Sequence, residues 1–117
     1  MKIREILQIL SAEVLVDNDQ LENTVVAAGA ADLMDDVLTA VAEGAVLLTG
    51  LTTEQALRTA IIAKVGAIVF VRGKDPDKNV VELAKSYNIP VLKTKYSLFV
   101  ACGRLYMNGL RGLDGSW

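Results

Sequence analysis

The sequence predicts an α/β fold: a single domain with a mainly parallel sheet and helices on both faces, a three-layer α/β/α arrangement. Three observations support this prediction. Segments 45–50 and 67–71 are continuous apolar runs, which is typical of strands covered on both faces. Residues 52–65 between them have the spacing of an amphipathic helix, so the stretch is a β-α-β unit. The chain has 117 residues, 52% of them hydrophobic, which is enough for one domain with a substantial core.

The central helix has a capping box and one apolar face. Thr52 and Gln55 have capping-box spacing, so we expect the helix to begin at Thr52. Ile62 falls among the polar residues, either as an ordinary exposed side chain or as part of a second contact surface. The predicted buried arc is Ala56, Leu57, Ala60, Ile61 and Ala63, and the polar side is Glu54, Gln55, Arg58 and Thr59.

The N-terminal part predicts a helix, two strands and a second helix. Residues 2–10 repeat apolar side chains at helical spacing, and 13–16 and 24–29 have strand character on either side of a turn. A hairpin between these strands is one alternative. Asp32 is expected to cap a helix that ends at Glu43-Gly44. The predicted buried face of that helix is Leu33, Met34, Val37, Leu38 and Val41.

The C-terminal part continues the alternation. Asp75-Pro76 predicts a helix start, residues 90–94 a strand, and residues 97–110 the last helix. We therefore place the domain at residues 1–110. Residues 111–117 have no periodicity and form a predicted tail, whose Trp117 could dock on the body. The buried stripe expected for the helix after Pro76 is Val80, Leu83, Ala84 and Tyr87, with Asn88 at its end.

Composition and motifs argue against several functional classes. A net charge of −2 gives no field that favours nucleic acid, and no apolar segment has the length of a membrane span. The N-terminus is broken by charges too early for a signal peptide, so we expect a cytoplasmic protein. With no His, and with Cys102 in an apolar helical context, we expect no enzyme activity and no cofactor. Gly73-Lys74 lacks the rest of a P-loop.

A ligand site is predicted where the strands end. Right-handed crossovers bring all loops after parallel strands to one edge of the sheet, where open α/β sheets bind ligands. The basic residues there suggest phosphate or carboxylate binding, and the alternative is that they are simply solvated. Asp32, Asp35 and Asp36 could hold a metal, but we favour a cap with its dipole partners and predict no metal site. The edge comprises Gly29, Ala31, Asp32, Thr49, Gly50, Thr52, Thr53, Arg72, Gly73, Lys74, Lys93, Thr94, Lys95 and Tyr96.

The last helix is apolar on more sides than one sheet can cover. Ser97, Arg104 and Asn108 form a polar stripe only about 40° wide. The helix therefore needs a second partner, either the N-terminal helix or a second copy of the chain, and we favour the dimer. Ala101 and Gly103 would permit close approach. The residues expected at the dimer interface are Ile62, Phe99, Cys102, Tyr106, Met107 and Leu110.

The order of these segments resembles that of the DRTGG domain. This family is similar to the N-terminal domain of HPr kinase/phosphorylase and occurs in phosphotransacetylases and CBS-containing pyrophosphatases. In the pyrophosphatases it belongs to a dimeric regulatory region associated with adenine nucleotides. The resemblance is carried by Glu13-Val14-Leu15-Val16, Ala27-Ala28-Gly29-Ala30, Glu43 to Gly50, Ala67 to Gly73 and Ile89-Pro90-Val91-Leu92.

The residues that name the family differ in this chain. Thr52-Thr53 stand where the family has Asp-Arg, and Arg72-Gly73-Lys74 stand where it has Thr-Gly-Gly. We interpret the chain as a free-standing regulatory or ligand-sensing domain, a homodimer that binds an anionic or adenine-nucleotide ligand. The alternative is a protein-interaction subunit without a small ligand, since some members look like companions of iron-hydrogenase systems. A third interpretation is an enzyme that uses loop carboxylates.

Overall fold

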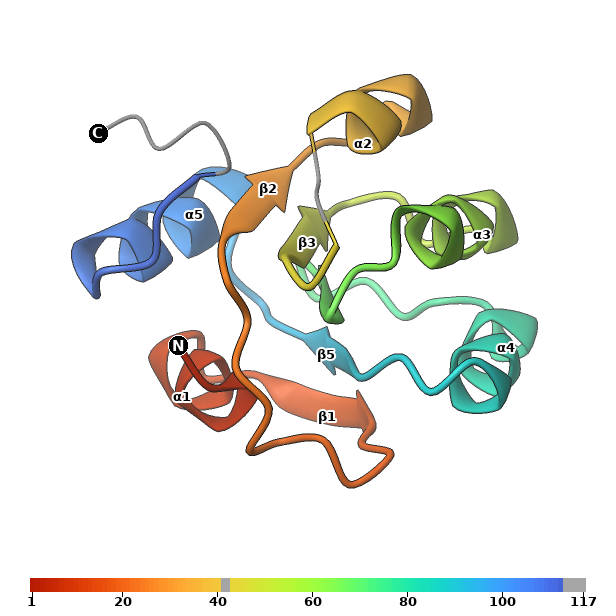
Figure 1. Ribbon diagram of the computed structural model, residues 1–117, viewed down its shortest axis with the longest axis horizontal. Helices are drawn as coiled ribbons and strands as arrows, with labels where there is room; N and C mark the ends of the chain where they lie inside the picture. The colour runs from red at the N-terminus through yellow and green to blue at the C-terminus, as the bar shows by residue number, and fades with distance from the viewer. Residues whose placement is uncertain (41–42, 113–117) are drawn as a thin grey trace.

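The computed structural model describes residues 1–40 and 43–112, with the backbone alone for residues 38–40 (Figure 1). The predicted alternation of strands and helices is confirmed from residue 28 onwards. The elements in order are α1 Ile3–Ile9, β1 Glu13–Val16, β2 Ala28–Ala30, α2 Met34–Ala40, β3 Val46–Thr49, α3 Glu54–Ala63, β4 Ala67–Phe70, α4 Lys78–Ser86, β5 Val91–Lys93 and α5 Leu98–Met107.

The five strands form one sheet in the order β1-β5-β4-β3-β2. Strands β2 to β5 are parallel neighbours, whereas β1 is antiparallel to β5, with Glu13 opposite Lys93. The predicted mainly parallel sheet is therefore confirmed. A hairpin between β1 and β2 is wrong, because the two strands lie at opposite ends of the sheet.

The segment before β2 is shorter as a strand than predicted. Of residues 24–29, only Ala28 and Gly29 belong to β2. Val25 donates its N–H to the carbonyl of Met1 at 2.8 Å, and Thr24 forms an isolated bridge with Lys2. Backbone groups of residues 24 and 25 therefore bond to residues 1 and 2, just before α1. In a longer β2, these groups would have paired with β3 instead.

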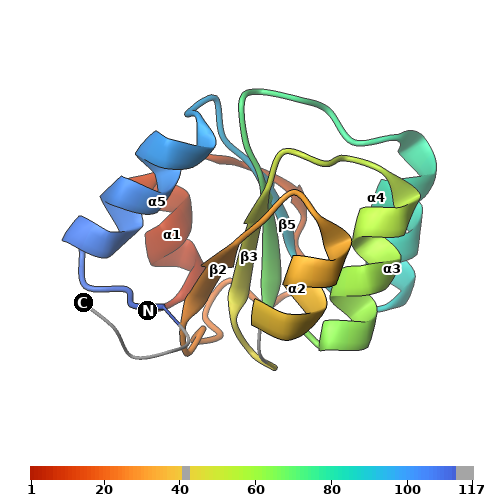
Figure 2. The ribbon, with the colours of Figure 1, turned by 90° about the horizontal axis from the view of Figure 1, so that it is seen from above.

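Two helical layers cover the sheet, as predicted for a three-layer fold (Figure 2). Helices α2, α3 and α4 lie on one face, and α1 and α5 lie on the other. Alternate residues of β3 and β4 point to the two layers, which is why every residue of both strands is buried. The first core includes Val37, Leu47, Leu57, Phe70 and Val80, and the second includes Ile3, Ile6, Leu48, Val69 and Leu105.

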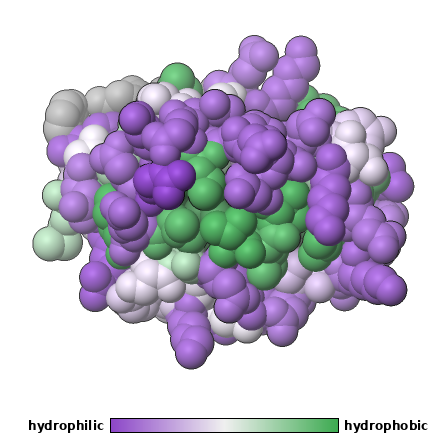
Figure 3. Space-filling model, turned by 90° about the horizontal axis from the view of Figure 1, so that it is seen from below, coloured by the Kyte–Doolittle hydropathy of each residue, from purple (hydrophilic) through white to green (hydrophobic). Residues whose placement is uncertain are grey.

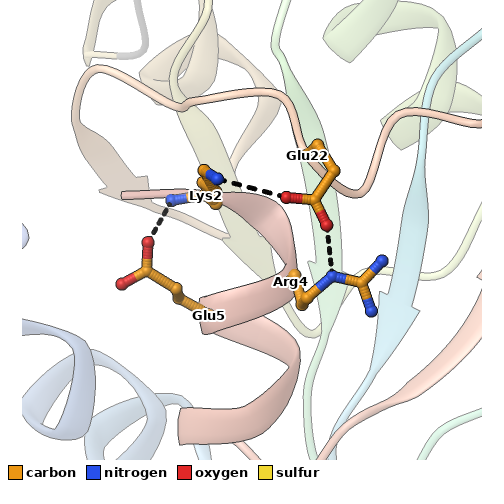
Figure 4. Close-up of polar contacts among 4 residues, drawn as sticks. All are labelled: Lys2, Arg4, Glu5 and Glu22. Carbon is orange, nitrogen blue, oxygen red and sulfur yellow. Dashed lines mark hydrogen bonds and ion pairs between the residues drawn. The ribbon is translucent and has the colours of Figure 1, made fainter.

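Ion pairs attach the start of α1 to the loop that precedes β2 (Figure 4). Glu22 accepts hydrogen bonds from Arg4 and from Lys2, the latter at 3.2 Å. These bonds hold the pKa of the Glu22 carboxyl below its ordinary value, and the bond from Arg4 has the larger effect. Glu5 accepts from the backbone N–H of Lys2 at 3.1 Å and so caps the helix.

Three helices begin later than the sequence predicts. Helix α2 begins at Met34. The N–H groups of Asp36 and Val37 donate to the carbonyl of Leu33, so the predicted cap at Asp32 is wrong by one residue.

The N-cap of α3 is Thr53, whose hydroxyl accepts from the N–H of Ala56 at 3.3 Å, so the predicted start at Thr52 is wrong by one residue. The N-cap of α4 is Asp77 rather than Asp75. Asp75 is engaged elsewhere, because its carboxylate accepts a hydrogen bond from Lys93.

Burial differs from the predicted helical faces at three residues. Leu33 is 69% exposed because it precedes α2, and Tyr87 is 54% exposed because it follows the last residue of α4. Thr59 is buried despite its place on the polar side of α3. Its hydroxyl donates to the carbonyl of Gln55 at 2.9 Å, which satisfies the polar group inside the helix. Of the remaining residues on the predicted face of α2, the side chain of Leu38 and all of Val41 lie outside the described part of the chain.

Figure 3 shows an apolar area surrounded by hydrophilic residues, on the side where α1 and β1 lie at the bottom of Figure 1. Half-buried side chains in these elements are Leu7, Val14 and Leu15. They are only partly covered because β1 is the outermost strand at this end of the sheet. None of the described helices has the length and apolar character needed to span a bilayer.

Candidate functional site

The loops that follow β4 and β5 diverge at the carboxyl edge of the sheet. The chain leaving β4 enters α4 on one face, whereas the chain leaving β5 enters α5 on the other (Figure 2). Neighbouring parallel strands whose loops part in this way create the point where open α/β sheets bind ligands. Sequence reasoning located the edge but not this point, since it did not establish which face each helix covers.

Gly50, which follows β3, lies at the centre of a polar cluster. Its N–H donates to Oδ1 of Asp32 at 2.8 Å, and the Thr49 hydroxyl is 3.3 Å from the same oxygen. Nη2 of Arg72 lies 4.0 Å from Oδ2 of Asp32 and 2.2 Å from the position that a Cβ on residue 50 would take. The absence of a side chain at Gly50 therefore makes room for the guanidinium.

Lys74 approaches Gly50 as well. Its ammonium donates to the carbonyl of Gly50 at 3.4 Å, so two cations and one carboxylate meet around a single glycine. Arg72 has a φ of 62°, which is uncommon for a residue with a side chain and which sets the position from which its side chain extends. The structure thus brings three residues of the predicted edge together: Gly50, Arg72 and Lys74.

The backbone N–H groups of this cluster are already used inside the protein. Arg72 donates to the carbonyl of Tyr96 at 2.8 Å and Gly73 to that of Thr94 at 2.9 Å, which ties the two diverging loops together. The N–H of Gly50 is bound to Asp32. An anion at this point would therefore be recognised by side chains, not by these three backbone donors.

The remaining two basic residues of the predicted site differ from each other. Nζ of Lys93 lies 2.6 Å from Asp75 and 3.5 Å from Glu13, and its side chain is only 18% exposed. The hydrogen bond to Asp75 holds the pKa of the Lys93 ammonium above its ordinary value. Lys95 is exposed, and its Cγ lies 3.8 Å from the position of a Cβ on Gly73. Lys95 thus extends the basic site, whereas Lys93 ties β5 to its surroundings.

The other predicted ligand residues have structural places. Thr53 caps α3, and Thr52 is half-buried in the loop before it. Gly29 lies inside β2 rather than in the loop after it. It contributes to a small cavity of about 150 Å³ between β2 and α5, which Cys102 and Leu105 also line. Burial raises the pKa of the Cys102 thiol. Among residues 1–40 and 43–112, no three His, Cys, Asp or Glu side chains form a potential metal site.

The residues predicted for a dimer interface do not form one continuous surface. Phe99 and Met107 on α5 are 87% and 85% exposed, and Tyr106 is partly exposed. Leu110 is buried in the core, and Ile62 is exposed on α3, on the opposite face of the sheet. Ile62 therefore cannot share one contact surface with α5. Trp117 lies outside the described residues.

Comparisons with known proteins agree with this architecture. No curated protein matches the chain. Among solved structures, it is similar to the CBS and DRTGG domains of the regulatory region of Clostridium perfringens pyrophosphatase, a structure described as a complex with the activator diadenosine tetraphosphate. The TM-score is 0.74 at 24% identity, over 89% of this chain and 45% of that one, which shows a shared fold. The family model of the DRTGG domain matches residues 5–106. The chain therefore belongs to the DRTGG domain family.

Proposed function

We propose that this chain is a cytoplasmic regulatory domain that senses an anionic, nucleotide-type ligand at the carboxyl edge of its sheet and acts as a dimer. The observation that carries the proposal is the meeting of Arg72 and Lys74 at Gly50, where the loops of neighbouring strands come together. Arg72 and Lys74, with exposed Lys95 beside Gly73, supply three positive charges in these loops, and positive charges attract anions.

The related pyrophosphatase region supports the choice of ligand class. Its activator, diadenosine tetraphosphate, is a nucleotide with several phosphates. Here Arg72 and Lys74 replace the residues that name the family, so the chemistry at this position is basic. We propose a regulatory rather than a catalytic role, because the similar structure is described as part of a regulatory region.

Charge reversal tests the proposed site. A nucleotide or pyrophosphate at 100 times its Kd should stabilise the wild-type fold by about 2.7 kcal/mol, which corresponds to a Tm increase of roughly 8–15 °C. The double variant Arg72→Glu/Lys74→Glu should lose this increase, because it replaces two attractive charges with two repulsive ones. The measurement is thermal unfolding with AMP, ADP and pyrophosphate.

The matched control is Lys64→Glu/Lys85→Glu. It makes the same change in net charge at the C-terminal ends of α3 and α4, at the opposite edge of the sheet. This control should keep the Tm increase. No stabilisation of the wild type by any of the three compounds, or equal loss in both double variants, would contradict the proposed site.

We assign the dimer contact to α5. Phe99, Gly103 and Met107 are four residues apart and therefore lie in one stripe, along a shallow groove of that helix. Apart from its chain neighbours and the backbone of its own helix, no atom of the described residues lies within 4 Å of the position of a Cβ on Gly103, so a second helix could approach closely. A twofold axis at Gly103 would place Phe99 of one subunit against Met107 of the other, which makes this surface self-complementary.

Light scattering at micromolar concentration tests this assignment. We expect a dimer for the wild type and a monomer for Met107→Asp, because a buried unpaired carboxylate would oppose association. Ile62→Asp is the matched control, since Ile62 is exposed on the other face of the sheet, and it should remain a dimer. A monomeric wild type would contradict the proposed dimer. A monomeric Ile62→Asp together with a dimeric Met107→Asp would show that the contact is made by α3.

A protein-interaction subunit is the second candidate. The observation in its favour is the same exposed pair, Phe99 and Met107, because large apolar side chains gathered on one helix often mark a surface that binds another protein. In this case the partner would be a different protein, and no nucleotide would stabilise the fold. The thermal unfolding and light-scattering experiments together separate the two candidates.

A further inference from the structure

The Asp32 carboxylate is held by one oxygen and presents the other. Oδ1 lies 2.8 Å from the N–H of Gly50 and 3.3 Å from the hydroxyl of Thr49, two neutral donors that fix its orientation. Oδ2 is 4.0 Å from Nη2 of Arg72, which is too far for a hydrogen bond, and the side chain is half exposed. An oriented acceptor therefore stands beside a cation at the edge of the site.

This arrangement does not suit a bare anion. A phosphate close enough to bind Arg72 would also lie close to Oδ2 of Asp32, and the two negative charges would repel each other. A ligand with a hydroxyl group near its phosphate removes this conflict. The hydroxyl donates to Asp32 as a charge-assisted hydrogen bond, while the phosphate accepts from Arg72. Acidic residues at strand ends bind ribose hydroxyls in this way in dinucleotide-binding folds.

On the basis of the proposed anion site, we infer that its ligand is a hydroxylated organic phosphate of the nucleotide class. The sugar hydroxyl donates to Asp32, and the phosphate is bound by Arg72 and Lys74. Asp32 is then a specificity residue: it disfavours inorganic phosphates and favours sugar phosphates. Thr49 and Gly50 are positioning residues, because they hold the carboxylate that accepts the hydrogen bond from the sugar hydroxyl.

Calorimetric titration with three compounds tests this inference. The probes are AMP, its 2′,3′-dideoxy analogue and inorganic pyrophosphate. The wild type should bind AMP about tenfold more tightly than the dideoxy analogue, because the analogue leaves the charged acceptor without its donor. In Asp32→Asn the preference should fall to about threefold or less, and pyrophosphate should bind more tightly than to the wild type.

The isosteric Asn keeps an oxygen that can accept from Gly50, so the loop retains its main hydrogen bond. Asp19→Asn is the matched control. It makes the same chemical change in the loop after β1, which lies at the opposite edge because β1 is antiparallel to β5. This control should keep the wild-type preference, and the comparison of AMP with its analogue in the wild type tests the inference even without a variant.

The outcomes separate the inference from the function on which it rests. Equal affinity of the wild type for AMP and its analogue, or an unchanged preference in Asp32→Asn, overturns the role of Asp32. If binding is still lost in Arg72→Glu, the proposed anion site stands. Binding of none of the three probes, or binding that Arg72→Glu leaves intact, overturns the inference and the proposed site together.

Discussion

Replacing Phe70 with alanine should lower the free energy of unfolding by about 3–5 kcal/mol. Phe70 ends β4 and is fully buried in the core between the sheet and helices α2 to α4. Removing the ring loses its apolar contacts and leaves a cavity that the packed helices can fill only in part. Denaturant unfolding measures the loss as a lower midpoint at an unchanged slope.

Phe99 provides the control, because it is the only other phenylalanine in the chain and is 87% exposed. Phe99→Ala should change the free energy of unfolding by less than about 0.5 kcal/mol. The comparison is made at a protein concentration where the subunits are dissociated, since association would add its own stability. A loss below about 1 kcal/mol for Phe70→Ala would contradict the packing at the end of β4.

Thr94→Val should cost about 1–3 kcal/mol although it preserves the shape of the side chain. Thr94 is 1% exposed, and its hydroxyl donates to the carbonyl of Leu10 at 2.7 Å. It also accepts from the N–H of Tyr96 at 3.3 Å. Valine would leave the Leu10 carbonyl and the Tyr96 N–H without this partner. A buried polar group that loses its partner destabilises the fold, because its lost hydration is no longer compensated.

A second buried threonine makes a matched control. The hydroxyl of Thr59 bonds within its own helix, to the carbonyl of Gln55, so Thr59→Val should cost less than Thr94→Val. Chemical unfolding of the two variants under identical conditions gives the difference. Equal losses would show that the bond between Thr94 and Leu10 has no special importance for stability.

The predictions that succeeded used local patterns. The apolar runs of β3 and β4 and the helix between them repeat at short spacing, so the sequence reveals them without any knowledge of partners. The pairing of β1 with β5 has no such local signal. Helix starts also depend on tertiary contacts: Lys93 bonds to the carboxylate of Asp75, and α4 begins after Asp77 instead.

For the candidate site too, the sequence predicted some residue positions and missed contacts that depend on the tertiary structure. Order along the chain placed Gly50 and Arg72 at one edge, since consecutive parallel strands are usually neighbours. The partnership of Asp32 with Gly50 was missed because Asp32 was interpreted as a helix cap, whereas Leu33 precedes α2 in the structure and the Asp32 carboxylate accepts from Gly50. Lys93 was expected among the exposed ligand residues, but Glu13 approaches it from a strand whose position the sequence does not reveal.

The pairing of β1 with β5 has a consequence for the order of folding. Strands β2, β3 and β4 each pair with the next strand along the chain, so this part can grow by successive additions. Strand β1 precedes β2 to β5 in the chain, yet Glu13 pairs with Lys93. During translation, β1 cannot pair until β5 has left the ribosome. Of the strand pairings in this sheet, that of β1 with β5 therefore closes the longest loop.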